Sequence, residues 1–125
     1  MQNKPNRLSR IRQSLASLAK EIERLLPVFM EREPMVKGTV YKQRRKCGKP
    51  VCACVTGKLH ESMILSRSER GRTKLISISV DRVSPLQVLT GRYQRFRRAR
   101  ARLGQLYKKM LMLLDKLEAS RRQEP

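Results

Sequence analysis

The sequence is poor in the residues on which several common protein functions depend. It has no Trp, and only three Tyr and two Phe in 125 residues. This scarcity argues against the aromatic-lined grooves that bind single-stranded nucleic acids by base stacking. No apolar run approaches the ~18 residues needed to span a bilayer, and the first residues lack the apolar core of a signal peptide. We therefore expect a cytoplasmic protein that is not associated with a membrane.

Groups for catalysis are also scarce. His60 is the only histidine in the chain. No pair of acidic residues is placed for acid–base work, and no glycine-rich phosphate loop or Ser-His-Asp set is present. We therefore predict that the protein is not an enzyme.

Acidic residues are few in relation to basic ones. Ten Asp and Glu stand against thirty Lys and Arg, which gives a net charge of +20. A charge of this size repels itself in the free protein and favours a polyanionic partner. Nucleic acid is the first candidate, because neutralising its phosphates releases counterions. An anionic membrane surface is a weaker alternative, because the arginines do not line the polar face of a helix with Trp or Phe opposite.

Every cysteine lies close to the single histidine. The four residues Cys47, Cys52, Cys54 and His60 fall within fourteen positions. Three thiolates and one imidazole can fill all four positions of a tetrahedral Zn²⁺ site, which leaves none open for a substrate. The spacing C-x4-C-x-C-x5-H is not a standard zinc-finger pattern, so three reduced thiols and a surface histidine are the alternative. A disulfide would leave an odd cysteine in a chain with no mark of secretion.

The cysteine segment resembles a family of short prokaryotic proteins that are classed only as a domain of unknown function. The resemblance covers roughly residues 38–100, and its most specific part is Cys47, Gly48, Lys49, Pro50, Cys52, Cys54, Gly57, Leu59 and His60. Genes of this family often lie near transposases and other mobile-element genes. The family usually continues with His-Gly-Pro and aromatic residues, whereas this chain continues with Glu61-Ser62-Met63-Ile64. The resemblance implies a setting in a mobile-element or other nucleoprotein system, and no mechanism.

A heptad series precedes the cysteine segment. Steps of three and four residues connect Leu8, Ile11, Leu15, Leu18, Ile22, Leu25 and Phe29. This spacing predicts a helix with a coiled-coil seam. Asn6 is the expected N-cap, and Pro34 should end the helix.

A second heptad series follows the cysteine segment. It comprises Leu86, Leu89, Tyr93, Phe96, Arg100, Leu103, Tyr107, Met110, Leu114 and Leu117. Ser84 and Pro85 suit the cap and the first position of this second helix. Arg100 is interpreted as a polar seam residue that sets the register. Two such helices joined by a compact insertion should fold back as an antiparallel hairpin that sets Phe29 against Phe96.

The middle of the chain has the period of a sheet. Residues 36–46, 62–67 and 74–80 are rich in β-branched and alternating apolar residues and predict three strands. A hairpin turn around Gly71 should join the last two. The predicted fold is therefore α+β, with two long helices as an antiparallel coiled-coil hairpin flanking a small three-stranded, zinc-stabilised β-meander. The predicted parts are an N-terminal coiled-coil helix (1–35), a basic zinc-binding β region (36–83) and a C-terminal arginine-rich coiled-coil helix (84–125).

Basic residues concentrate in two places, beside the cysteines and on the second helix. The predicted nucleic-acid contacts are Tyr41, Lys42, Arg44, Arg45, Lys46, Lys49, Lys58, Arg92, Arg95, Arg97, Arg98 and Arg102. The arginines favour bidentate contacts with phosphates. Tyr41 is the one aromatic residue placed to stack on a base, because the other four fall on predicted seam positions.

The C-terminal helix is apolar on more than one side. A helix of this kind needs cover from more than one neighbour. We therefore expect self-association or docking on a larger protein through Leu106, Met110, Leu111, Leu113 and Leu114. The predicted function is that of a zinc-stabilised accessory protein that binds DNA or RNA through the backbone. The alternative is a coiled-coil assembly subunit of a larger ribonucleoprotein, transposase or nuclease complex, which acts mainly by protein–protein contact.

Overall fold

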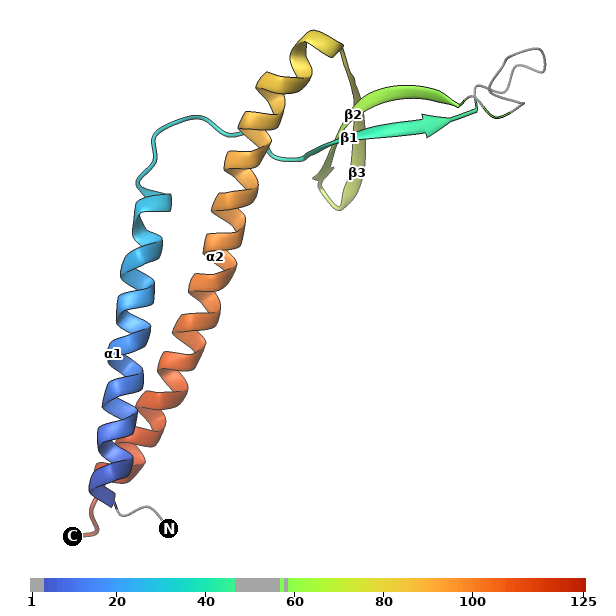
Figure 1. The fold of residues 1–125 in the computed structure, drawn as a ribbon. Helices are drawn as coiled ribbons and strands as arrows, with labels where there is room; N and C mark the ends of the chain where they lie inside the picture. The colour runs from blue at the N-terminus through green and yellow to red at the C-terminus, as the bar shows by residue number, and fades with distance from the viewer. Residues whose placement is uncertain (1–3, 47–56, 58) are drawn as a thin grey trace. The chain divides into compact units, whose positions relative to one another are not determined.

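The computed structural model of the chain has two helices and a three-stranded antiparallel sheet, as the sequence predicts for the α+β class (Figure 1). It describes residues 4–46, 57 and 59–125. The elements are α1 (Lys4–Phe29), β1 (Thr39–Arg45), β2 (His60–Glu69), β3 (Arg72–Ile78) and α2 (Val80–Arg121). Neither helix contains, in its described residues, a stretch long and apolar enough to cross a bilayer.

The chain forms two compact units. The first, here called the helical unit, comprises Met1–Arg32 and Phe96–Pro125. The second, the sheet unit, comprises Glu33–Arg95. Helix α2 contributes to both, because its first part lies in the sheet unit and the remainder in the helical unit.

The predicted apolar face of α1 is its buried face. All seven heptad residues are at least partly buried, and Ile11 and Leu18 are buried. Near the end of the helix the ring of Phe29 meets that of Phe96 edge to face, with 5.2 Å between the centroids. This confirms the contact predicted between the two series. The helix begins at Lys4, so Asn6 lies inside its first turn and the prediction that it is the N-cap is wrong.

Three of the seven seam positions predicted for α2 in the helical unit are displaced by one residue. The buried and half-buried positions are Phe96, Ala99, Arg102, Leu103, Leu106, Met110, Leu113, Leu117 and Ser120. Arg100, Tyr107 and Leu114 are exposed, and the residue before each of them takes its place. Spacing cannot distinguish the members of the adjacent apolar pairs at 106–107 and 113–114. The observed register keeps the tyrosine hydroxyl and the Arg100 guanidinium in solvent, which avoids the cost of desolvating them.

The sheet has the order β1-β2-β3, with β2 in the centre. Residues that oppose each other in an antiparallel pair share a face. The register therefore gathers on one face Val40, Met63, Leu65, Ile76 and Ile78. Ile64 and Leu65 point to opposite faces and are both 5% exposed, so the middle of β2 is covered on both sides. The predicted turn between the last two strands is also present, as Arg70-Gly71.

The start of α2 lies four residues before the predicted cap. The helix begins at Val80, so Ser84 and Pro85 lie inside it and the predicted cap is wrong. The Ser79 carbonyl accepts a hydrogen bond from the Arg82 amide at 3.0 Å, which closes the first turn.

The segment that leads into β1 is fixed to α2 by hydrogen bonds within the sheet unit. The Val36 amide donates to the Leu89 carbonyl at 3.1 Å, and the Arg92 guanidinium donates to the Pro34 carbonyl at 3.1 Å. Gly38 then enters β1 with a φ of 136°. A Cβ at this position would lie 2.7 Å from the Ser66 carbonyl oxygen, so only glycine lets β1 approach β2 here.

Candidate nucleic-acid interface

The basic end of β1 has two differently charged sides. Lys42 and Arg44 point to the same side as Glu61, which lies directly opposite Arg44 in β2. The Glu61 carboxylate is 3.1 Å from Arg44 Nε and 3.6 Å from Lys42 Nζ. One acid is thus shared by two cations, and this side keeps a net positive charge.

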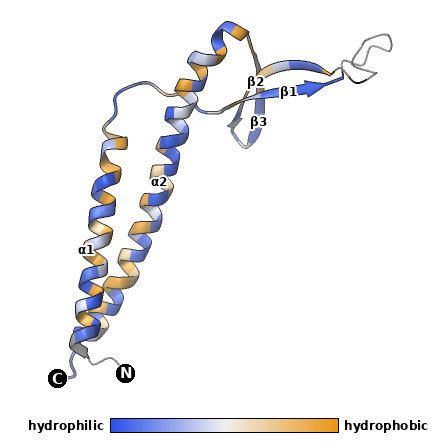
Figure 2. Ribbon diagram, in the orientation of Figure 1, coloured by the Kyte–Doolittle hydropathy of each residue, from blue (hydrophilic) through white to orange (hydrophobic). Residues whose placement is uncertain are grey.

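Tyr41 and Arg45 lie on the other side of β1, because successive strand residues alternate. Tyr41 is opposite Ile64 and is 37% exposed, and Arg45 is opposite His60. Lys46 follows the strand and is exposed. Figure 2 shows β1 as an almost wholly hydrophilic strand. The strand register therefore gathers Tyr41, Arg45 and His60 on one side of β1 and β2, and Lys42, Arg44 and Glu61 on the other.

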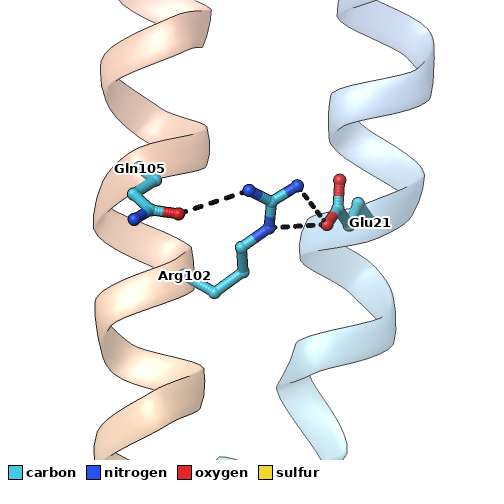
Figure 3. A network of polar contacts seen from close by, with 3 residues as sticks. All are labelled: Glu21, Arg102 and Gln105. Carbon is cyan, nitrogen blue, oxygen red and sulfur yellow. Dashed lines mark hydrogen bonds and ion pairs between the residues drawn. The ribbon is translucent and has the colours of Figure 1, made fainter.

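Two of the predicted arginines on α2 already have partners inside their own unit. Arg92 holds the Pro34 carbonyl in the sheet unit. In the helical unit, Nε and Nη2 of Arg102 each lie 2.7 Å from Oε1 of Glu21, and Nη1 donates to Gln105 at 3.3 Å (Figure 3). These guanidinium groups tie chain segments together.

The other three predicted arginines of α2 lie at the surface. Arg95, in the sheet unit, and Arg97 and Arg98, in the helical unit, are exposed. Arg97 and Arg98 have no ion pair within the described part of the chain. Their helix therefore offers guanidinium groups to an external anion.

A further basic group, which the sequence did not reveal, lies where β2 turns into β3. It consists of Arg67, Arg70, Arg72 and Lys74, with Glu69 among them. In the sequence these cations alternate with serine, glutamate, glycine and threonine, so they do not form a run. The strand register brings them together. In the sequence, the turn predicted around Gly71 was the one sign that these cations could be neighbours.

The residues predicted to hold zinc are mostly outside the described residues. Cys47, Cys52 and Cys54 lie there, as do Lys49 and Lys58. His60 is described, and it is the exposed first residue of β2. Among the described residues no three His, Cys, Asp or Glu side chains are grouped to hold a metal ion. The zinc site therefore stays a prediction.

The predicted protein-contact residues of α2 divide into buried and exposed ones. Leu106 is fully buried in the helical unit, and Met110 and Leu113 are half-buried. Leu111 is 62% exposed and Leu114 42%, and the neighbouring Tyr107 is 49% exposed. Because 107, 111 and 114 are spaced by four and three residues, they lie on one side of α2. The exposed stripe available to a partner is thus Tyr107, Leu111 and Leu114.

Comparison with known proteins gives one family. A model described as a domain of unknown function, DUF6788, matches residues 7–88, about two thirds of the chain. The match includes most of α1, all three strands and the first turns of α2. No curated protein and no solved structure matches the chain.

Proposed function

The chain belongs to the DUF6788 family, and we propose that it is a small, zinc-stabilised accessory protein that binds nucleic acid by its phosphate backbone. The setting implied by the family resemblance is a mobile-element or other prokaryotic nucleoprotein system. The observation that carries the proposal is the net charge of +20. It is supported by two acids, Glu61 and Glu69, that are each shared by two cations.

Both of these shared acids lie in the sheet unit. Glu61 is shared by two cations, Lys42 and Arg44. Glu69 is likewise shared by Arg67 at 2.7 Å and Lys74 at 3.6 Å. Further acids to neutralise the remaining cations are few, so an external polyanion is the natural counter-charge. Arginine suits this role because its planar guanidinium binds phosphate oxygens in pairs.

The proposal is tested by the salt dependence of binding. The affinity of the full-length protein for short nucleic acids should fall linearly on a log–log plot against salt, with a slope of about −0.9 per contacted phosphate on duplex DNA. Arg97→Gln with Arg98→Gln should reduce both affinity and slope. Arg12→Gln is the control, because Arg12 is an exposed arginine of α1 outside the proposed interface. A slope near zero would contradict the proposal.

The zinc part of the proposal has a separate test. We assign Cys47, Cys52, Cys54 and His60 as ligands because three thiolates and one imidazole can supply all four ligands of a tetrahedral zinc ion. Elemental analysis should give one zinc per chain, and Cys52→Ser should lower both the zinc content and the thermal stability. Ala53→Ser is the control, because it introduces a serine hydroxyl at the adjacent position without removing a proposed ligand. Purified protein without zinc and with an unchanged fold in Cys52→Ser would refute the site.

Assembly through the helices is the second candidate function, and the exposed stripe Tyr107, Leu111 and Leu114 favours it. Phe29 contacts Phe96 and Glu21 contacts Arg102, so α1 and the last part of α2 run in opposite directions. We infer that this pair is a coiled coil whose stripe meets a second copy or a larger partner. Sedimentation should show that Leu111→Glu dissociates an oligomer, whereas Ala101→Glu, an equal charge change at an exposed position, does not. If the wild-type protein is a monomer in this experiment, self-association is ruled out.

A further inference from the structure

The β2–β3 turn projects beyond the third strand of the sheet. Strand β1 pairs with β2 only as far as Thr39 opposite Ser66. Beyond that point β2 and β3 continue to pair through Arg67 with Lys74, Ser68 with Thr73, and Glu69 with Arg72. The last three pairs are thus a two-stranded ribbon, here called the basic ribbon (residues 67–74). All its side chains from Ser68 to Lys74 are exposed.

The charge of the basic ribbon is strongly positive and only partly compensated. Four cations and one acid give residues 67–74 a net charge of +3. Glu69 is held by Arg67 and Lys74. Arg70 and Arg72 have no ion pair with any described residue. They line a surface hollow of about 1010 Å³ together with Lys37, Lys74 and Glu69, so four cations and one acid surround it.

The conformation of the turn is unfavourable for the residue that occupies it. Arg70 and Gly71 have φ values of 49° and 78°. Positive φ at both central positions defines a type I′ turn, for which Asn-Gly is the preferred sequence. Arg70 is the one residue other than glycine with a positive φ in the described part of the chain. A residue in an unfavourable backbone conformation is an indication of function, and here that residue places a guanidinium at the tip of the turn.

From these observations, and resting on the nucleic-acid-binding function proposed above, we propose that the basic ribbon binds duplex DNA. Its tip enters the major groove, and Arg70 and Arg72 contact the flanking phosphates. The major groove of B-form DNA is about 12 Å wide and admits a two-stranded β-ribbon. The corresponding groove of duplex RNA is too deep and narrow to be entered in this way. The two-stranded form of the ribbon therefore favours DNA over RNA.

The test compares variants of the 125-residue chain on a labelled mixed-sequence DNA duplex. Arg70→Asn and Arg72→Gln should each weaken binding by about threefold to tenfold and reduce the salt slope by about one phosphate. Arg12→Gln should change affinity by less than about twofold. Because asparagine suits the type I′ turn better than arginine, Arg70→Asn should not lower the melting temperature. A loss of affinity in this variant is then a loss of contact and not of fold.

The outcomes separate this inference from the proposed function. Wild-type protein that binds no nucleic acid would overturn both. The ribbon alone would be overturned if the wild-type protein binds DNA and the double change Arg97→Gln with Arg98→Gln weakens this binding, but neither Arg70→Asn nor Arg72→Gln does. Equal or tighter binding to duplex RNA of the same sequence, or to the single strands, would overturn the assignment to duplex DNA. Unchanged affinity for DNA whose major groove is filled by glucosylated cytosines would overturn entry into that groove.

Discussion

The two units of this protein carry the same charge on almost the same length of chain, yet they organise it differently. The helical unit has 16 basic and six acidic residues in 62 positions, and the sheet unit has 14 and four in 63, so each has a net charge of +10. In the helical unit the cations are distributed along two helices around an apolar seam. In the sheet unit strand pairing gathers them at both ends of β2, beside Glu61 and beside Glu69.

Helices and sheets differ in which neighbouring residues can be recognised from the sequence. Along a helix, residues that meet are three or four positions apart, so a run such as Arg97-Arg98 remains visible as a cluster. Across a sheet, neighbours such as Arg44 and Glu61 are far apart in sequence and meet only through the register.

The largest effect should come from Leu106, which is fully buried. Leu106→Ala removes a core side chain from the seam, and we expect it to lower the free energy of unfolding by about 3 kcal/mol. Leu114→Ala removes the same atoms from an exposed position and should cost less than about 1 kcal/mol. Urea denaturation followed by far-UV circular dichroism measures both. A larger loss for Leu114→Ala than for Leu106→Ala would mean that the seam has the register expected from the sequence and not the one observed.

The next largest effect should come from Gly38 in the sheet unit. Gly38→Ala places a Cβ 2.7 Å from the Ser66 carbonyl oxygen at a φ of 136°, which should destabilise the protein by about 2 kcal/mol. The cause is a backbone clash, so repacking of side chains cannot relieve it.

Gly91→Ala is the control for Gly38→Ala in the same unit. Gly91 lies within α2, and nothing lies within 4 Å of an added Cβ. Gly91→Ala should leave the free energy of unfolding unchanged or raise it by up to about 1 kcal/mol. Loss of stability in both variants would show that glycine-to-alanine changes are harmful in this unit for a reason other than the strand approach.

The helices and the strands differ in how far the sequence could predict them. The strands and the seam of α1 follow from periodicity, because one face of each must be buried. The register of α2 did not follow, because Leu106 and Tyr107 fit the heptad spacing equally well. Its start at Val80 was missed because Ser84 and Pro85 imitate a helix beginning. The basic ribbon was missed because its cations become neighbours only once β2 and β3 are aligned.

A smaller effect of opposite sign is expected at Gly104 of the helical unit. This residue is exposed in the middle of α2, and an added Cβ would meet nothing within 4 Å. Gly104→Ala should therefore stabilise the protein by about 0.5–1 kcal/mol, because alanine restricts the unfolded chain and favours the helix. Thermal melting should show a higher midpoint. A lower midpoint would reveal a close contact of α2 at this position, such as a second copy of the chain.

The smallest effect should separate arginines that join the helices from arginines that are free for an anion. Arg102 and Glu21 form an ion pair across the helical unit, with side chains 42% and 38% exposed. At this exposure a double-mutant cycle of Arg102→Gln and Glu21→Gln should give a coupling energy of about 0.5 kcal/mol. Because Arg102 is already engaged, Arg102→Gln should change nucleic-acid affinity less than Arg98→Gln, which removes an equal charge from an exposed arginine only four residues away. If both substitutions weaken binding equally and the cycle shows no coupling, then the cations of this unit act as an undifferentiated charge, and the distinction drawn here between its paired and open arginines is wrong.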